Sequence, residues 1–434
     1  MNKSQKHFKI KIDGINDSGI GYAKVIKDEK QYYNLMIPYV LPNEEVTVTI
    51  DNNYNENALC SILNINKISD DRISGECEHF TKCGNCFLQH WSYDKYYSWK
   101  LDLIRQPLKK ISPNTKIFQM INSPKFARRR AKFFSETLKQ NNFVGFKKFK
   151  SNEILNINKC IVLDPEIFEF IKFFKSQINN TNTPHKNISI SVNKLDFGLD
   201  IIIEFDNLYL KDLLEKIFYQ NTHLRIITVY LKYKNNLPEL IFSMHKNKLT
   251  IDSKVYCLIP PNGFIQPTKF TENKLINYIY EEINQNKKIK ILDLYSGSGT
   301  FSLPLAKRNQ NVFAIDINQS SINSLVQASR EQNLFHNIQC SVENLMKKEL
   351  DKTFLNKFDM IIIDPPRSGA FLQISKIAEI KIKKLISISC NVKSFLRDTK
   401  ILISNGYNLL YVKPIDQFIY TKHLEIFSVF EYRN

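Results

Sequence analysis

Short runs in which apolar and polar residues alternate occupy the first 66 positions of the chain. The runs FKIKIDGI, GIGYAKVI, YYNLMIP, EVTVTI and ALCSILNI are separated by Gly, Asn, Asp and Pro, which favour turns. A period of two predicts strands that bury one face. Strands at this spacing predict a small five-stranded barrel, a fold that often binds oligonucleotides. A barrel without a ligand would show the same pattern.

The pattern changes twice further along the chain. A helix is predicted from about Tyr93 to Lys110, and from about 165 to 260 the runs ISISVNKL, LDIIIEF, LRIITVYLKY and PELIFSM alternate with polar turns. These strand-like runs predict an antiparallel sheet, and we find no catalytic motif within it.

From Lys288 onward, continuous apolar strands alternate with helical stretches. The strands are KIKILDLYSGSG, NVFAIDIN, FDMIIIDPPR and KLISISCN. Strands without polar alternation, each followed by a helix, predict a parallel sheet covered on both faces. The C-terminal part is therefore expected to be a doubly wound α/β domain, whose ligands bind at the carboxyl edge of the sheet.

The net charge of the chain indicates the kind of partner it binds. Among 434 residues, Lys and Arg number 61 and Asp and Glu 43, which leaves a net charge of +18. This balance favours a polyanion such as RNA, and cations crowd in Lys125–Lys132 and, beside aromatic rings, in Phe146–Lys150. A solvated basic strand face is the alternative for either cluster. With no long apolar run and no apolar signal core at the start, we expect a soluble, cytoplasmic monomer that binds no membrane.

A glycine-rich turn ends the first strand of the predicted α/β domain. Residues 291–300 read ILDLYSGSGT, and Asp316 ends the next strand, where a carboxylate can accept hydrogen bonds from two ribose hydroxyls. Ser302 stands where a dinucleotide fingerprint needs a small residue, so NAD stays possible. Asp293 before the turn suits a methionine ammonium group better than a pyrophosphate. The stretch resembles the first two motifs of class I methyltransferases, which use S-adenosylmethionine.

Two further strand ends carry candidate chemistry. Asp364 follows the strand Met360–Ile363 in D-P-P-R-S-G, and Cys390 follows the next strand in L-I-S-I-S-C-N. Both should face the same crevice. A single Cys after an apolar run is more often a buried structural thiol, but a carboxylate at the same edge favours a reactive one.

These two motifs, with D-Q-F-I-Y-T-K-H-L-E near the C-terminus, resemble the signatures of RNA uracil-5 methyltransferases. At the N-terminus, IDGINDSGIGYAKV followed by VLPNEEVTV resembles a TRAM domain, an RNA-binding module of the OB type. The combination is similar to the RlmD-type branch, which acts on 23S ribosomal RNA. The resemblance covers nearly the whole chain and implies a TRAM domain (1–66), a central α+β domain with a cysteine cluster and basic RNA-binding segments (67–262), and a Rossmann-like methyltransferase domain (263–434).

The resemblance also assigns roles to residues. Uracil C5 is too weak a nucleophile to take a methyl group from a sulfonium, so a thiolate must first add to C6, and Cys390 would supply it. Glu425 would then remove the C5 proton, with His423 positioning its neighbours. The expected contacts of S-adenosylmethionine are Gln266, Tyr295, Thr300, Asp316, Asn344 and Asp364, although Thr300 stands where Asn is frequent.

The cysteines indicate a metal site. Cys77, Cys83 and Cys86 are crowded together, unlike a secreted disulfide framework, and the resemblance adds Cys160 as a fourth ligand. Four thiolates suit zinc and iron–sulfur clusters equally by spacing. The resemblance favours a structural [4Fe–4S] cluster.

Other functions fit parts of the sequence. A tRNA uracil-5 methyltransferase would share the chemistry, although the TRAM-like start and the cysteines argue against it. A noncatalytic RNA-binding assembly factor would keep the fold without needing Cys390 and Glu425. An iron–sulfur redox enzyme on a dinucleotide fold is a third alternative.

Overall fold

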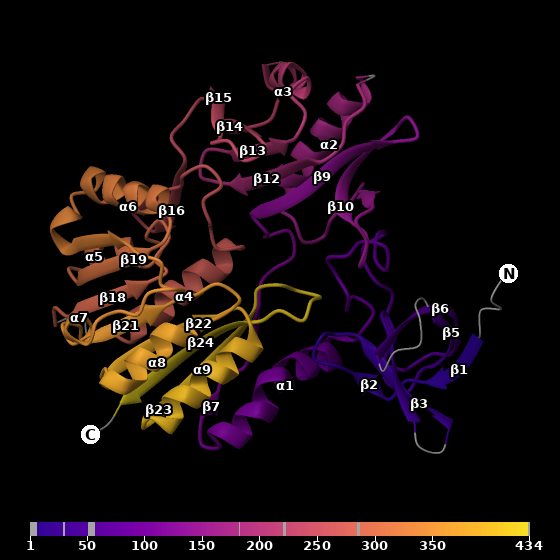
Figure 1. Ribbon diagram of the computed structural model, residues 1–434, viewed down its shortest axis with the longest axis horizontal. Coiled ribbons are helices and arrows are strands. Elements are labelled where there is room, and N and C mark those ends of the chain that lie inside the picture. The colour runs from indigo at the N-terminus through magenta and orange to yellow at the C-terminus, as the bar shows by residue number, and fades with distance from the viewer. Residues whose placement is uncertain are drawn as a thin grey trace. The chain divides into compact units, whose positions relative to one another are not determined.

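The structure is a computed structural model that describes residues 7–28, 31–50, 57–181, 183–219, 223–283 and 287–432 (Figure 1). The described residues fall into two compact units. The first extends to Leu103 and adds Lys148–Asn152 and Phe418–Lys422, and the second contains Ile104–Lys147, Glu153–Gln417 and the chain from His423. Within the described ranges, no helix has the length and apolar character needed to cross a membrane.

The first unit begins with the strands that the alternating pattern predicts. Among the described residues the sheet has six strands rather than five, because the run FKIKIDGI breaks at Ile12, whose amide donates to the Glu44 carbonyl oxygen at 2.9 Å. The sheet order is β1-β5-β6-β4-β3-β2. The strands are β1 (His7–Lys11), β2 (Gly14–Ile15), β3 (Gly21–Asp28), β4 (Gln31–Ile37), β5 (Glu45–Ile50) and β6 (Asn57–Lys67).

A buried ion pair closes one end of this sheet. The Glu44 carboxylate is fully buried and accepts hydrogen bonds from Arg72 Nε at 2.5 Å and from the Leu41 amide at 2.8 Å. The Arg72 guanidinium also donates to the Tyr39 carbonyl oxygen at 2.8 Å. Because each buried polar atom of the carboxylate has a partner, the charge is tolerated in the core. The apolar core beside it contains Ile12, Ala23, Leu35, Ile37, Val40, Val46, Val48, Ala58 and Cys60.

The predicted helix is confirmed as α1 (Tyr93–Ile111). After it, the second unit contains a sheet in the order β11-β10-β9-β12-β13-β14-β15. Helix α2 (Pro165–Asn179) packs against β10 and β12 of this sheet. Its strands are β9 (Arg130–Leu138), β10 (Asn141–Lys147), β11 (Ile154–Asn156), β12 (Ile188–Lys194), β13 (Leu199–Phe205), β14 (Ile226–Tyr233) and β15 (Glu239–Ser243).

The prediction of an antiparallel sheet for about 165–260 is wrong for one pair of strands, and the range also contains helices, as in the expected α+β domain. Residues Pro165–Asn179 form helix α2, and β13 pairs with β14 in parallel. The parallel pair follows from α3 (Leu210–Tyr219), a crossover helix that buries Leu210, Leu214 and Phe218. A parallel connection requires such a crossover, whereas a turn would have made the strands antiparallel.

The C-terminal sheet confirms the predicted doubly wound arrangement. Its order is β20-β19-β18-β21-β22-β24-β23-β7, with β8 also paired to β23. The strands are β7 (Lys116–Ile117), β8 (Ile121–Asn122), β18 (Lys290–Leu294), β19 (Asn311–Asp316), β20 (Ile338–Val342), β21 (Met360–Ile363), β22 (Lys384–Ser389), β23 (Tyr407–Asp416) and β24 (Glu425–Tyr432). The hairpin β16 (Lys248–Asp252) and β17 (Val255–Leu258) precedes this sheet.

Helices cover both faces of this sheet because its central strands are apolar on both sides. One shared core joins residues of α4, α5 and α6 to Ile386, Ile388, Phe427 and Val429 of the strands. Figure 1 shows α8 and α9 over the other face, in front of β22 to β24. The helices are α4 (Lys269–Glu281), α5 (Ser302–Lys307), α6 (Gln319–Glu331), α7 (Lys352–Leu355), α8 (Phe371–Ile380) and α9 (Val392–Ser404), with a 3-10 turn at Phe335–Asn337.

Candidate active site

The carboxyl ends of the parallel strands place the predicted residues at one edge of the sheet. Strands β19, β18, β21 and β22 are parallel neighbours in that order. Asp316 is the last residue of β19, and Asp364 and Cys390 directly follow β21 and β22. All three residues therefore lie at the same edge of the sheet. Strand β24 runs antiparallel to β22, with Ser389 opposite Ile426, so its first residue, Glu425, lies at this edge as well.

The glycine-rich turn after β18 needs backbone conformations that favour glycine. Tyr295, Gly297 and Gly299 all have positive φ, at 63°, 53° and 89°. A Cβ at Gly299 would meet Leu325 Cδ1 at 2.4 Å, so a side chain there would force Leu325 to shift, in addition to the strain of a positive φ. A Cβ at Gly297 would meet nothing within 4 Å, which leaves open space above the turn.

Asp316 fastens this turn to the neighbouring strand. Its Oδ2 accepts a hydrogen bond from the Gly297 amide at 2.9 Å, and its Oδ1 accepts one from the Asn318 amide at 2.8 Å. The carboxylate thus lies beside the open space above Gly297. This is the position from which an acidic residue binds ribose hydroxyls in nucleotide sites.

Several buried polar atoms around the turn lack partners. Asp293 Oδ2 accepts from Ser302 Oγ at 2.5 Å, but Asp293 Oδ1 and the hydroxyls of Ser296 and Ser298 have no hydrogen-bond partner among the described residues. Burial raises the pKa of Asp293 to about 7, and the nearby Asp316 adds to the rise. Unpaired buried polar atoms are costly, so this group fits a ligand that donates hydrogen bonds, such as an ammonium group.

Asp364 lies between this cofactor side and the candidate catalytic pair. Its Oδ2 accepts a hydrogen bond from Gln266 Nε2 at 3.0 Å. Burial and the charge of Asp293 raise the pKa of Asp364 to about 7, while the Gln266 amide opposes the rise. A carboxyl group that titrates near neutrality can donate or accept a hydrogen bond to a bound base.

Cys390 is half-buried between the end of β22 and the start of α9. The Asn391 side chain caps α9 by accepting from the Lys393 amide at 3.0 Å and donates to the Arg367 carbonyl oxygen at 2.9 Å. Burial raises the pKa of the Cys390 thiol to about 12, with further increases from Glu425 and Asp364, whereas Arg367 lowers it. The Cys390 thiol therefore lies close enough to both carboxyl groups for their charges to raise its pKa, and Arg367 favours its thiolate form.

Glu425 is almost completely buried and is oriented by a second buried side chain. Gln417 Nε2 donates to Glu425 Oε2 at 2.8 Å. Burial raises the pKa of Glu425 well above the usual value and Asp364 adds to the rise, but Gln417 opposes it. A carboxyl group with a raised pKa is a stronger base when it is ionised.

Of the three remaining expected cofactor contacts, two lie beside the glycine-rich turn and one does not. The Tyr295 hydroxyl lies 3.6 Å from Met346 Sδ, and Asn344 Oδ1 caps its own loop by accepting from the Met346 amide at 3.1 Å. The Thr300 hydroxyl interacts with the buried thiol of Cys257, so it points toward the core. Tyr295 and Asn344 therefore flank the glycine-rich turn, whereas Thr300 is engaged elsewhere.

The cysteine cluster is divided between the two units. Cys77, Cys83 and Cys86 are partly exposed in the first unit, and Cys160 is partly exposed in the second. Backbone hydrogen bonds hold Cys77 and Cys83: the Phe80 amide donates to the Cys77 carbonyl oxygen at 2.9 Å, and the Cys83 amide donates to the His79 carbonyl oxygen at 2.9 Å. Among the residues that the structure describes, no group of three or more His, Cys, Asp or Glu side chains is arranged to hold a metal ion.

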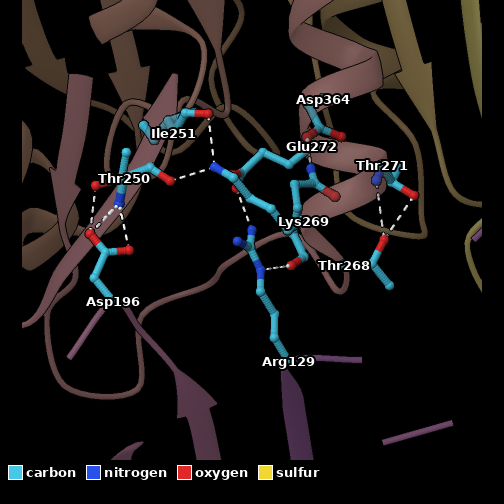
Figure 2. Close-up of polar contacts among 10 residues, drawn as sticks. Arg129, Asp196, Thr250, Ile251, Thr268, Lys269, Thr271, Glu272 and Asp364 are labelled. Atoms are coloured by element: carbon cyan, nitrogen blue, oxygen red, sulfur yellow. Dashed lines mark hydrogen bonds and ion pairs between the residues drawn. The ribbon is translucent and has the colours of Figure 1, made fainter. Parts of the chain in front are cut away.

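Two elements of the site were not anticipated from the sequence. Gln417 lies within the quoted D-Q-F-I-Y motif, which gives it no role. In the structure β23 pairs with β24 so that Ile415 lies opposite Glu425, and the Gln417 side chain reaches the Glu425 carboxylate. Arg129, interpreted above as part of a basic RNA-binding run, is instead buried in an ion pair with Glu272 (Figure 2).

Comparison with known proteins identifies the family. The sequence model of the tRNA (Uracil-5-)-methyltransferase family matches residues 93–432. The chain belongs to this family. The expectation of a methyltransferase is thereby confirmed, and the uracil-5 resemblance is confirmed with it.

Two relatives and one solved structure match nearly the full length of this chain. A 23S rRNA (uracil(1939)-C(5))-methyltransferase RlmD of Vibrio vulnificus is 26% identical, covering 99% of this chain and 98% of the relative. An RNA methyltransferase of Mesorhizobium japonicum is also 26% identical, over 98% and 97% of the two chains. The Pyrococcus abyssi tRNA (uracil-54, C5)-methyltransferase, solved with S-adenosyl-L-homocysteine, has a TM-score of 0.71 at 22% identity, covering 98% of this chain and all of that one. The last match shows a shared fold.

Proposed function

We propose that this protein transfers a methyl group from S-adenosylmethionine to C5 of a uridine in 23S ribosomal RNA. The observation that carries the proposal is the meeting of Cys390, Glu425 and Asp364 at one sheet edge, next to a glycine-rich turn with unpaired polar atoms. A thiol, a buried base and a carboxyl group that can bind the uracil edge are the groups that C5 methylation requires.

The residues around the turn fit the methyl donor. Asp293 and the hydroxyls of Ser296 and Ser298 can accept hydrogen bonds from its ammonium group, and Asp316 from its ribose hydroxyls. The donor supplies an electrophilic methyl group when it is bound. Gln266, Tyr295 and Asn344 would form the other walls of this site, with Thr300 the weakest candidate because its hydroxyl faces Cys257.

The proposed steps balance without an oxidant or a metal. The Cys390 thiolate adds to uracil C6, and the electron pair of the C5–C6 double bond moves to C5. That pair then forms the bond to the incoming methyl group while the bond between the methyl carbon and the sulfonium sulfur breaks, and its electron pair stays on the sulfur of the leaving S-adenosylhomocysteine. Glu425 then removes the C5 proton. The electrons of the C5–H bond restore the double bond, and the C6–S bond breaks to return the thiolate.

We infer that Asp364 and Gln266 hold the uracil edge together. The Gln266 amide fixes one oxygen of Asp364 at 3.0 Å, which leaves the other oxygen for the base. With a pKa of about 7, Asp364 can accept from uracil N3–H as a carboxylate or donate to a uracil carbonyl as an acid. The base would have to leave its stack to reach this depth.

We further propose that Cys77, Cys83, Cys86 and Cys160 hold a structural [4Fe–4S] cluster. Supporting this, burial and then the charges of Cys83 and Cys86 raise the pKa of Tyr39, so both thiols lie near this one side chain. Thiolates also suit zinc, so the donor set alone does not decide the metal. Iron, zinc and acid-labile sulfide analysis of anaerobically purified protein distinguishes the two, and zinc with no sulfide would overturn the cluster.

The choice of 23S ribosomal RNA is supported by the full-length similarity to the Vibrio vulnificus relative and by the N-terminal strands that we propose as a TRAM domain over 1–66. The domain division at 66 and 262 and a monomeric, cytoplasmic enzyme are part of the same proposal. The test is methyl transfer from labelled S-adenosylmethionine to unmodified 23S ribosomal RNA and to unmodified tRNA, followed by nucleoside mass spectrometry. Product in tRNA alone would overturn the substrate, and product in neither RNA would favour the noncatalytic RNA-binding factor.

A further inference from the structure

The loop that carries Gln266 is held by residues of the central sheet. Arg129, directly before β9, donates from Nε to the Gln266 carbonyl oxygen at 2.9 Å, and its backbone amide donates to the Pro267 carbonyl oxygen at 2.9 Å. On β12, Asn193 Nδ2 donates to the Gly263 carbonyl oxygen at 3.1 Å. Both ends of the segment Gly263–Pro267 are therefore fixed from outside the C-terminal sheet.

Arg129 is itself held rigidly. Its guanidinium pairs with Glu272 at the start of α4, and the two side chains are 6% and 0% exposed (Figure 2). The second oxygen of Glu272 accepts from Lys269 Nζ at 2.9 Å, and Lys269 also donates to the Ile251 carbonyl oxygen at 2.8 Å. A guanidinium has a fixed fork of donors, so pairing one arm with Glu272 aims the Nε–H at Gln266.

We propose that Arg129 is a positioning residue that acts through Gln266, holding the loop so that the Gln266 amide stays on Asp364. The chain of contacts runs from Glu272 to Arg129, to the Gln266 backbone, and from the Gln266 side chain to Asp364. Arg129 therefore acts on the site of the methyl donor and the uracil through the Gln266 loop, because its own guanidinium is occupied by Glu272 and the Gln266 carbonyl oxygen. The inference rests on the proposed function in taking Gln266 as a contact of the donor.

A double-mutant cycle on S-adenosylmethionine affinity tests this role. Arg129→Lys keeps a positive charge for Glu272 but loses the fork that also reaches Gln266, and Gln266→Ala removes the side chain through which Arg129 acts. We expect Arg129→Lys to weaken binding about tenfold in the wild-type background and less than about twofold in the Gln266→Ala background. The same loss in both backgrounds would overturn the proposal.

A second variant and a control separate positioning from stability. Arg129→Met with Glu272→Met removes both charges, a replacement that folded proteins often tolerate, and should lose affinity as Arg129→Lys does. Wild-type affinity in this double variant would overturn the proposal even if Arg129→Lys failed to fold. Arg72→Lys in the buried Arg72–Glu44 pair of the first unit is the matched control and should bind S-adenosylmethionine normally.

Calorimetry without RNA makes this test independent of the substrate. If wild-type protein binds S-adenosylmethionine but methylates no uridine, the proposed function fails while the cycle can still be measured. If Arg129 acts through Gln266, the variant that combines Arg129→Lys with Gln266→Ala should lose less affinity for S-adenosylmethionine than the sum of the two single losses. A purely structural role would lower the melting temperature without this coupling.

Discussion

Gln417 offers a sharp test of how the base is prepared. Its amide donates to Glu425 Oε2 at 2.8 Å in a fully buried setting, so Gln417→Ala leaves that oxygen without its partner. A hydrogen bond to a charged group contributes about 1.5–3 kcal/mol, and each 1.36 kcal/mol changes a rate about tenfold. The loss predicts elimination that is slower by roughly 10- to 150-fold.

The same substitution should change the pH dependence in a known direction. Because Gln417 lowers the pKa of Glu425, its loss raises that pKa further, so the fraction of ionised base at neutral pH falls. The rate of elimination should therefore recover as the pH rises. Single-turnover reactions with labelled RNA, resolved on denaturing gels, would show a covalent protein–RNA species that persists longer than in wild type.

A matched control distinguishes this effect from a general loss of a buried glutamine. Gln310 is also buried, and its Oε1 accepts from the Ile289 amide at 2.9 Å, at the opposite end of the strands from the candidate site. Gln310→Ala should lower the melting temperature and leave the lifetime of the adduct unchanged. An unchanged adduct lifetime in Gln417→Ala would refute the reasoning about Glu425.

Three further predictions follow from the site and the first unit. Cys390→Ala should abolish methyl transfer while S-adenosylmethionine binds as before; any residual turnover near the wild-type rate would exclude the covalent route. Because the pKa of Cys390 is raised to about 12, the fraction of reactive thiolate grows with pH. Single-turnover methylation should therefore accelerate between pH 6 and pH 9. A flat profile would argue against rate-limiting thiolate formation. Arg72→Met should destabilise the protein by about 3–5 kcal/mol in chemical denaturation because it leaves Glu44 charged and unpaired, whereas Lys95→Met at an exposed pair should cost under about 1 kcal/mol.

The sequence predicted the C-terminal architecture well because the signal is local. Continuous apolar strands such as Met360–Ile363 are buried on both faces, and residues that follow parallel strands necessarily meet at one edge. The proximity of Asp364 and Cys390 follows from this rule. The place of Glu425 additionally requires the antiparallel strand β24, which the sequence pattern did not predict; the resemblance assigned Glu425 its role but not its strand.

Other features depend on partners far away in the chain. Arg129 belongs to a run of cations that looks like an RNA-binding surface, but its partner Glu272 lies 143 positions downstream. Strand β14 was expected to be antiparallel to β13, because the apolar residues of α3 between them were not interpreted as a crossover helix. Neither outcome can be deduced from a short window of sequence, since burial and pairing are decided by tertiary contacts.

The measurement that tests the central claim most directly is trapping of the adduct with Glu425→Gln. This variant keeps the size of the side chain and its contact with Gln417 but cannot take the C5 proton, so methylated RNA should stay bound through Cys390. The account predicts a slowly migrating protein–RNA complex on a denaturing gel, carrying label from S-adenosylmethionine and absent when Cys390 is also replaced by Ala. Full release of 5-methyluridine RNA by Glu425→Gln, with no such complex, would contradict it.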